Sequence, residues 1–289
     1  MQNYLNLLQE ILDTGVTKAD RTGVGTISIF GTHLRYDLSK GFPAVTTKEL
    51  KFKSVLSELL WFISGSTNEL DLREIHHGTR DTNKKTIWTA NAEAEYWKPS
   101  RPGDLGHVYG YQWRKWNTGR LTWNSSSESE PLIIDQLDAL IKGIKSNPDS
   151  RRHIVTAWNP GEIDIMALPP CHYLFQCYIA NGKLSLKFNM RSVDCFLGLP
   201  FNIASYAILC HMIAQVCDLQ VGDLIFDGGD THIYLNHIDQ VTEQLSRTPL
   251  SLSTIWLNPD IKEIDAFTMN DIKLLEYHHH PSITAKMAV

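Results

Sequence analysis

Apolar residues recur at helical spacing in four long stretches of the chain. Residues 2–13 and 132–145 each carry one apolar face, and the second of these is stopped by Asn147-Pro148. Residues 54–64 are largely apolar, and residues 202–217 are apolar on nearly every side. Because a helix that is apolar all round must be covered on all sides, the pattern predicts that residues 202–217 form a central helix.

Shorter alternating or apolar runs predict strands, and Asn181-Gly182 between two of them predicts a hairpin turn. The expected strands cover residues 26–30, 153–158, 173–180 and 184–188, followed by shorter strands over 223–235 and a helix over 238–246. Residues 77–131 are rich in polar residues, Trp, Gly and Pro, and 125–130 are expected to form a solvated loop. With no repeat or linker, the chain is expected to be a single α+β domain over residues 1–289, with helices packed on a large, mostly antiparallel or mixed sheet.

Composition and charge exclude several function classes. The chain has 289 residues and a formal net charge of −5, so no nucleic-acid partner is expected. The chain has no run of about 18 apolar residues, so no membrane span is expected. Its N-terminus lacks the basic region of a signal peptide. The five cysteines all lie within residues 171–217 without CxxC spacing, which fits neither a disulfide framework nor a zinc site. We therefore expect a cytoplasmic protein in a reducing compartment.

One cysteine stands in a setting that suits a nucleophile. Pro169-Pro170 precede Cys171-His172 and restrict the backbone that leads into a predicted strand. The thiolate is the reactive form of cysteine, and arginines close to Cys171 would lower its pKa. A structural role is the alternative reading for Cys171, and the other four cysteines lie in apolar runs that favour the core.

Two arginine sets flank the elements next to that cysteine. Arg151-Arg152 follow Asp149-Ser150, and Arg191-Ser192 end a predicted strand. Paired guanidinium groups and a hydroxyl match the requirements of a phosphate dianion. Solvated surface charge is the alternative.

Two further polar side chains interrupt apolar runs. Glu58 lies inside the apolar helix of residues 54–64, where burial would raise its pKa and suit it to proton transfer, unless it is a satisfied structural acid. Asn202 is either the N-cap of the following helix or a reader of a pyrimidine edge. The runs His76-His77 and His278–His280 lack spaced partner ligands, so no metal site is expected.

Taken together, these motifs resemble the thymidylate synthase family over essentially the whole chain. The resemblance rests on Asp20–Gly23, Gly41–Lys48, Glu58–Phe62, Tyr109-Gly110, Asp149–Arg152, Ala167–His172, Gly198–Asn202, Gly228–Tyr234 and Met287–Val289. It implies a symmetric homodimer that joins a carbon from 5,10-methylenetetrahydrofolate to C5 of dUMP, without a metal. Cys171 would add at C6 of the base and so make C5 nucleophilic.

The resemblance also implies a role for individual residues. For the nucleotide, Arg21, Arg191 and Ser192 would bind the phosphate, Arg151 and Arg152 would reach it from the other subunit, His232 and Tyr234 would hold the ribose hydroxyl, and Asn202 would bind the base edge. Tyr109 and His172 would order the polar network, and Glu58 would relay protons through water. Trp88, Asp194, Gly198 and the C-terminal Val289 would hold and close over the folate, and Lys48 would face its glutamate tail.

Two positions depart from the usual synthase pattern. The chain has Asn189-Met190-Arg191-Ser192 where synthases usually have Tyr-Gln-Arg-Ser, and Thr89 where they have Asp after the tryptophan. Both departures are similar to the bacteriophage deoxycytidylate hydroxymethylases, in which water captures the methylene and tetrahydrofolate leaves. Met190 and Thr89 are therefore the candidate product-determining residues.

The base-reading position keeps Asn202, which suits uracil rather than cytosine. The expected activity is thus a dUMP hydroxymethylase, such as serves a bacteriophage that builds 5-hydroxymethyluracil DNA in its host's cytoplasm. The alternatives are a thymidylate synthase, with drift at both positions, and a non-catalytic nucleic-acid-binding relative. The extra residues near 93–102 and 121–130 are expected to be surface insertions.

Overall fold

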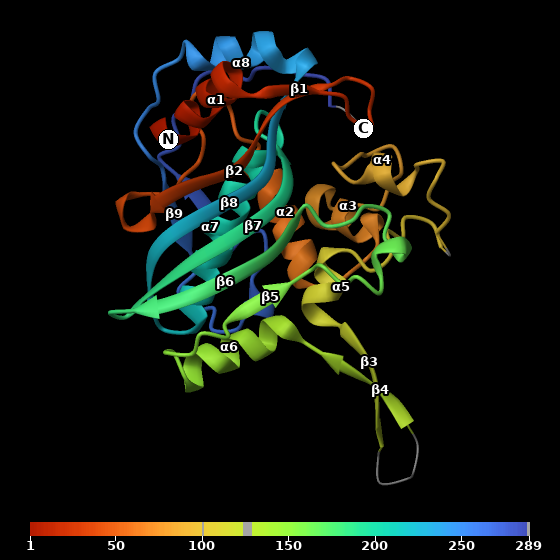
Figure 1. Cartoon of the computed structure of the whole chain (residues 1–289). Coiled ribbons are helices and arrows are strands. Elements are labelled where there is room, and N and C mark those ends of the chain that lie inside the picture. Colours follow the sequence, from red (N-terminus) through yellow and green to blue (C-terminus); the bar gives the residue numbers. More distant parts are fainter. Residues whose placement is uncertain (100, 124–128, 288–289) are drawn as a thin grey trace.

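The computed structural model describes residues 1–99, 101–123 and 129–287, and a six-stranded mixed sheet organises them (Figure 1). The strands follow the order β1 (Val16–Lys18), β2 (Thr26–Asp37), β8 (Gln220–Tyr234), β7 (Lys183–Asp194), β6 (His172–Ala180) and β5 (Ile154–Thr156). β7 and β8 run parallel, and the other neighbours are antiparallel. The α+β class with a mixed sheet is thus confirmed.

One face of the sheet is apolar and covered by helices. The row Val155, Phe175, Phe188, Phe226 and Leu34 crosses five strands in register, and each of its side chains is buried. Strands alternate their side chains between the two faces, so this inner row packs on α7 (Gly198–Val216), which contacts both β7 and β8. α7 lies behind the sheet in Figure 1.

The opposite, outer face has a different character. Its matching row is Ile154, Gln176, Lys187, Ile225 and Arg35, of which the two end residues are exposed. No helix among the described residues covers this face in Figure 1. Exposed apolar side chains there include Ile154, at 44%, and Tyr178, at 67%.

The remaining helices surround α7 and the inner face. They are α1 (Gln2–Thr14), α2 (Phe52–Ile63), α3 (Glu69–His77), α4 (Thr89–Ala92), α5 (Tyr109–Arg114), α6 (Gln136–Ser146) and α8 (Ile238–Leu245). A two-stranded sheet of β9 (Thr254–Leu257) and β10 (Ile272–Leu275) completes the C-terminal part.

α7 confirms the prediction of a central helix. Within the described residues it alone is long and apolar enough to cross a membrane, although no such run was expected from the sequence. Some 78% of that apolar window is buried inside the fold, which is the environment of a core helix. The cytoplasmic location stays a prediction.

Several sequence-based boundaries were wrong. The strands expected over 26–30 and 184–188 extend to Asp37 and Asp194. The helix expected over 132–145 begins at Gln136, because the preceding residues form β4 (Ser129–Ile134), which pairs with β3 (Trp116–Trp123). Asp135 accepts a hydrogen bond from the backbone N–H of Asp138 and so caps the helix there. The shorter strands expected over 223–235 are one 15-residue strand, β8. Residues 125–128 of the expected loop lie outside the described residues.

Candidate active site

The backbone of Cys171 is held from two sides. Its N–H donates to the Tyr109 hydroxyl of α5 at 2.7 Å, and its carbonyl accepts from the Arg191 N–H of β7 at 2.9 Å. The side chain is half-buried. The thiol therefore sits at a fixed point where β6 begins, as the Pro-Pro-Cys-His sequence led us to expect.

Arg191 is the cation that reaches the thiol. Its Nη2 lies 3.8 Å from Cys171 Sγ, and its guanidinium donates to the carbonyls of Pro169 and Pro170, at 2.9 Å each. Arg191 lowers the pKa of Cys171 as expected, but burial outweighs it and the net pKa lies above the ordinary value. The expected lowering by a nearby arginine is therefore confirmed, but burial sets the net direction of the Cys171 pKa in the ligand-free chain.

Glu58 carries the most strongly shifted carboxyl pKa of the site. Burial raises the pKa from 4.5 to about 7, against a smaller lowering by the indole of Trp88, which donates to Glu58 Oε1 at 2.8 Å. Trp88 lies edge-on to Phe62 and packs near Tyr109, with ring centroids 6.4 and 5.9 Å away. The Glu58 carboxyl is therefore only partly protonated near neutral pH, so it can both donate and accept a proton in a relay.

His172 is held as a neutral ring beside the nucleophile. Burial lowers its pKa to about 3, its Nδ1 lies 2.9 Å from the Tyr206 hydroxyl, and it stacks on Tyr109 at 4.0 Å. A neutral, stacked ring fits the predicted role of ordering the polar network rather than acid–base transfer. Tyr206 was missed by the sequence reading, although its hydroxyl within an apolar helix is the same signal that identified Glu58.

The ends of β7 and β8 bring further predicted residues together. Ser192 is in register with Asp230, and Asp194 with His232, whose Nδ1 lies 3.2 Å from Asp230 Oδ1. The rings of His232 and Tyr234 are 5.1 Å apart.

Arg21 comes to the same region on a short loop. The Asp20 carboxylate accepts hydrogen bonds from the Thr22 N–H at 2.9 Å and the Gly25 N–H at 2.7 Å, and the Arg21 side chain remains exposed. Charges on Asp20, Arg21, Asp194 and Cys171 all contribute to the pKa of Tyr234, which burial raises. Asp20 as the organiser of this loop was not predicted.

Asp194, Gly198 and Asn202 converge at the start of α7. Asp194 Oδ1 accepts from the backbone N–H groups of Phe196, at 2.9 Å, and Leu197, at 3.3 Å. Asn202 is the fifth residue of α7, so the N-cap reading was wrong. A Cβ built on Gly198 would lie 3.8 Å from both Asn202 Oδ1 and Asp194 Cβ. The Asn202 amide makes no hydrogen bond to the described part of the chain, so it is free for a ligand.

The Lys48 side chain points into the protein. A lysine that contacts the glutamate tail of a folate would be expected at the surface. Lys48 is 6% exposed, donates to the Phe196 carbonyl, and its Nζ lies 3.6 Å from the centre of the Phe196 ring. Burial lowers its pKa to about 8. Its folate contact stays a prediction, and Val289 lies outside the described residues.

The two candidate product-determining residues differ in position. Met190 is buried on the inner face, opposite His172 in the β6–β7 register, and so lies close to Cys171. Thr89 is 1% exposed, and its hydroxyl donates to Glu69 Oε1 at 2.7 Å. An aspartate at position 89 would place a second carboxylate beside Glu69. The Thr89 hydroxyl therefore belongs to a buried hydrogen-bond network centred on Glu69.

Arg151 and Arg152 lie at the other end of β6 from the nucleophile. The next residue, His153, accepts from the N–H of Cys177 at 2.9 Å. Cys177 is six residues along the chain from Cys171, which is about 20 Å of extended strand. Both arginines are exposed, and neither reaches Cys171 of the same chain.

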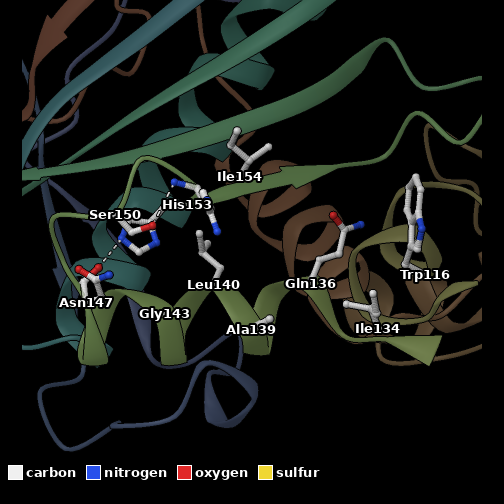
Figure 2. A pocket seen from close by; sticks show the side chains of 11 residues that line it. Trp116, Ile134, Gln136, Ala139, Leu140, Gly143, Asn147, Ser150, His153 and Ile154 are labelled. Atoms are coloured by element: carbon white, nitrogen blue, oxygen red, sulfur yellow. Dashed lines mark hydrogen bonds between the residues drawn. The ribbon is translucent and has the colours of Figure 1, made fainter. Parts of the chain in front are cut away.

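Arg152 instead lines a separate cavity of about 470 Å³ between α6 and β5. Figure 2 shows this cavity, with Trp116 at one end and His153 near Asn147 at the other. His153 Nε2 lies 3.1 Å from the Asn147 carbonyl. None of the other predicted site residues lines it, so it is not the reaction site.

The adjacent histidines have local partners. His76 Nδ1 lies 2.9 Å from Ser57 Oγ, and His77 Nε2 lies 3.0 Å from the Lys85 carbonyl. His280 Nε2 lies 2.9 Å from the Thr248 carbonyl. The described residues contain no group of three or more metal-ligating side chains, and the expected lack of a metal stays a prediction.

The raised pKa of Glu58 predicts a pH-dependent gain of stability in Glu58→Gln. An acid whose pKa is higher in the folded than in the unfolded chain binds more protons when folded, so it destabilises the fold as pH rises from 4.5 through 7. Glutamine removes this effect and still accepts from Trp88. In urea unfolding we expect the free energy of unfolding of Glu58→Gln to match that of the parent below this range and to exceed it by about 3 kcal/mol above it.

Glu10→Gln is the matched control, because Glu10 is exposed on α1. Its difference from the parent should not change with pH. A constant difference for Glu58→Gln across the same range would show that the carboxyl is not destabilised in the fold.

Comparison with known proteins agrees with this geometry. The family described as Thymidylate synthase matches residues 2–289. Two proteins named Thymidylate synthase, from the Dugway 5J108-111 and RSA 331 / Henzerling II strains of Coxiella burnetii, are each 49% identical to this chain over 289 residues, which is 100% of both sequences. The chain belongs to the thymidylate synthase family.

Proposed function

We propose that the chain is a thymidylate synthase, which converts dUMP and 5,10-methylenetetrahydrofolate to dTMP and dihydrofolate. The observation that carries the proposal is the full-length match to proteins named thymidylate synthase, together with the convergence of Arg191, Glu58 and Tyr109 around Cys171. The enzyme is in any case a one-carbon transferase of this family.

In this proposal Cys171 begins the reaction. Its thiolate adds to C6 of the uracil ring, C5 then attacks the methylene carbon of the folate and loses its proton, and the folate amine leaves. The tetrahydrofolate then delivers a hydride to the exocyclic methylene as the thiolate leaves C6, which gives dTMP and dihydrofolate. Glu58, with its pKa near 7, moves protons to and from the base and the folate. Arg191 holds the phosphate beside the thiol, and Asn202 pairs with the base edge through its donor and acceptor.

The position of Thr89 favours the synthase over the hydroxymethylase expected from the sequence. A hydroxymethylase needs water at the exocyclic methylene, and Thr89 was one of two residues expected to order it. Its hydroxyl is instead bonded to Glu69 inside the fold. The relatives are also named thymidylate synthase, and Met190 is the departure that lies close to Cys171.

The first test is the identity of the product. Mass spectrometry of the nucleotide made from dUMP and methylenetetrahydrofolate should find dTMP, with dihydrofolate absorbance rising in step. Cys171→Ser should lose both product and the covalent complex with fluoro-dUMP, whereas Cys217→Ser, just past the C-terminal end of α7, should keep them. Hydroxymethyl-dUMP without dihydrofolate would overturn the synthase and restore the hydroxymethylase.

The second test concerns the base. A carboxylate can accept from the exocyclic amine of cytosine, whereas O4 of uracil is an acceptor that needs the N–H donor of an asparagine amide. Asn202→Asp should therefore lower kcat/KM for dUMP by about 100-fold and admit dCMP. Unchanged discrimination between the two nucleotides would show that Asn202 does not contact the base edge.

The active form in this proposal is a homodimer that buries the outer face of the sheet. Arg151 and Arg152 lie about 20 Å of strand away from Cys171 of their own chain. The outer face carries exposed Ile154 and Tyr178, and an isologous contact between two such faces would bury both. The arginines of one subunit then complete the phosphate site of the other.

Mixing two inactive variants tests this arrangement. A mixed dimer of Cys171→Ala and Arg152→Ala subunits has one site with both an intact cysteine and an intact partner arginine. Random re-association should therefore restore roughly a quarter of the parental activity. Activity no higher than that of Arg152→Ala alone would contradict the shared site.

A further inference from the structure

Two threonines flank Trp88, and both donate to one buried carboxylate. Thr86 Oγ1 and Thr89 Oγ1 each lie 2.7 Å from Glu69 Oε1 of α3. The threonines are also joined to each other, because the Thr86 N–H donates to Thr89 Oγ1 at 2.9 Å. The Trp88 N–H donates to Thr86 Oγ1 at 3.2 Å. The backbone on both sides of Trp88 is therefore anchored to Glu69.

The anchor is itself fixed by an ion pair within α3. Arg73, one helical turn after Glu69, places Nε 2.8 Å from Oε1 and 2.7 Å from Oε2. Glu69 is 0% exposed and Arg73 is 3% exposed. A buried carboxylate needs such pairing, because leaving it without a partner costs far more than a surface charge does.

Stability alone does not account for a buried ion pair. Apolar side chains of similar volume stabilise a core as well or better, so a buried pair is weak evidence for a role in stability. Buried hydrogen bonds do, however, fix the geometry of the groups that they join, and here both threonines and Arg73 donate to Glu69 Oε1, while Oε2 is held by the ion pair alone. Here the fixed group is the segment that carries Trp88.

Trp88 connects this anchored segment to Glu58. Its indole N–H donates to Glu58 Oε1 at 2.8 Å, and its ring packs near Trp61 at 5.6 Å and Tyr109 at 5.9 Å. A continuous path of hydrogen bonds thus runs from Glu69 through Thr86 and Trp88 to Glu58.

We propose that Glu69 is a positioning residue for the reaction, which acts through Thr86, Thr89 and Trp88 on the carboxylate of Glu58. The inference rests on the proposed function, because it assigns to Glu58 the proton transfers of that reaction. Thr89 then contributes by anchoring Trp88 rather than by meeting the methylene.

The proposal has a signature that a general loss of stability does not share. The Trp88 hydrogen bond lowers the pKa of Glu58, so a displaced indole allows that pKa to rise above about 7. The neighbouring titratable groups do not interfere: burial raises the pKa of Tyr109 and Cys171 and lowers that of His172 to about 3. A carboxyl that titrates near neutral pH therefore reports on Glu58.

The experiment is a pH titration of the side-chain carboxyls of ¹³C-labelled glutamate by NMR, with Glu58 assigned by its loss in Glu58→Gln. In Glu69→Gln the Glu58 signal should titrate higher by roughly one pH unit. At neutral pH kcat should fall about tenfold, with KM for dUMP changed less than about twofold. Glu93→Gln is the matched control, because Glu93 is the exposed carboxylate 3.8 Å from the same Arg73. This variant should change neither the titration of Glu58 nor kcat.

Single hydroxyl deletions keep the proposal testable if Glu69→Gln does not fold. Thr86→Val and Thr89→Val leave the ion pair intact and should each raise the titration of Glu58, whereas Thr89→Ser should retain the parental value. A folded Glu69→Gln, or a folded pair of valine variants, with Glu58 titrating as in the parent would overturn the proposal. The titration needs no turnover, so a failure to form dTMP would overturn the proposed function without deciding this result.

Discussion

The burial of α7 against the inner face of the sheet is the constraint on which the rest of the molecule depends. Fourteen of the 19 residues of α7 are buried, so the helix is stable only where other elements cover it on every side. The apolar rows of β7 and β8 cover one side, and α2 packs on another. Tyr206 stacks on Phe188 at 4.3 Å within this contact and carries its hydroxyl to His172. The contact between α7 and the sheet thus forms the core and also positions the Tyr206 hydroxyl beside His172.

Burial also determines which groups of the site carry charge. It raises the pKa of Glu58 to about 7, lowers that of His172 to about 3 and raises that of Cys171, so these groups tend toward their neutral forms. Arg191 is the cation in contact with the thiol. Such a site has little charge of its own in the volume where the uracil ring would react, and Glu58 is the group whose protonation changes near neutral pH. That arrangement suits proton transfer through Glu58 in the proposed reaction.

Thr89 illustrates how a departure from a family pattern can mislead. Next to Trp88 in sequence, it was predicted to help determine the product of the reaction. In the fold, Trp88 points toward Glu58 while the Thr89 hydroxyl points toward Glu69. Adjacent residues of a short helix project in different directions, so proximity in sequence does not place both side chains in the same cavity. The synthase reading therefore loses one of its two apparent exceptions.

The sequence by itself determined the elements with strong local signals and pointed to most of the polar residues that the fold brings together near Cys171. The apolar periodicity predicted α1, α2 and α7, Asn181-Gly182 predicted the β6–β7 turn, and the polar residues inside apolar runs pointed to Glu58 and Asn202. These features depend on side-chain type and spacing, which are properties of the sequence itself. The β3–β4 hairpin was missed because its polar residues resemble those of a loop. Its two strands are stabilised by pairing with each other, which side-chain pattern alone does not reveal.

Only the tertiary structure decided the relations between distant residues. The pairing of Glu69 with Thr89, the inward turn of Lys48, the wide separation of Arg152 from Cys171 and the net rise of the Cys171 pKa depend on packing between elements far apart in sequence. Burial and distance are properties of the folded chain as a whole, so spacing along the sequence names the chemical groups but does not fix which of them meet.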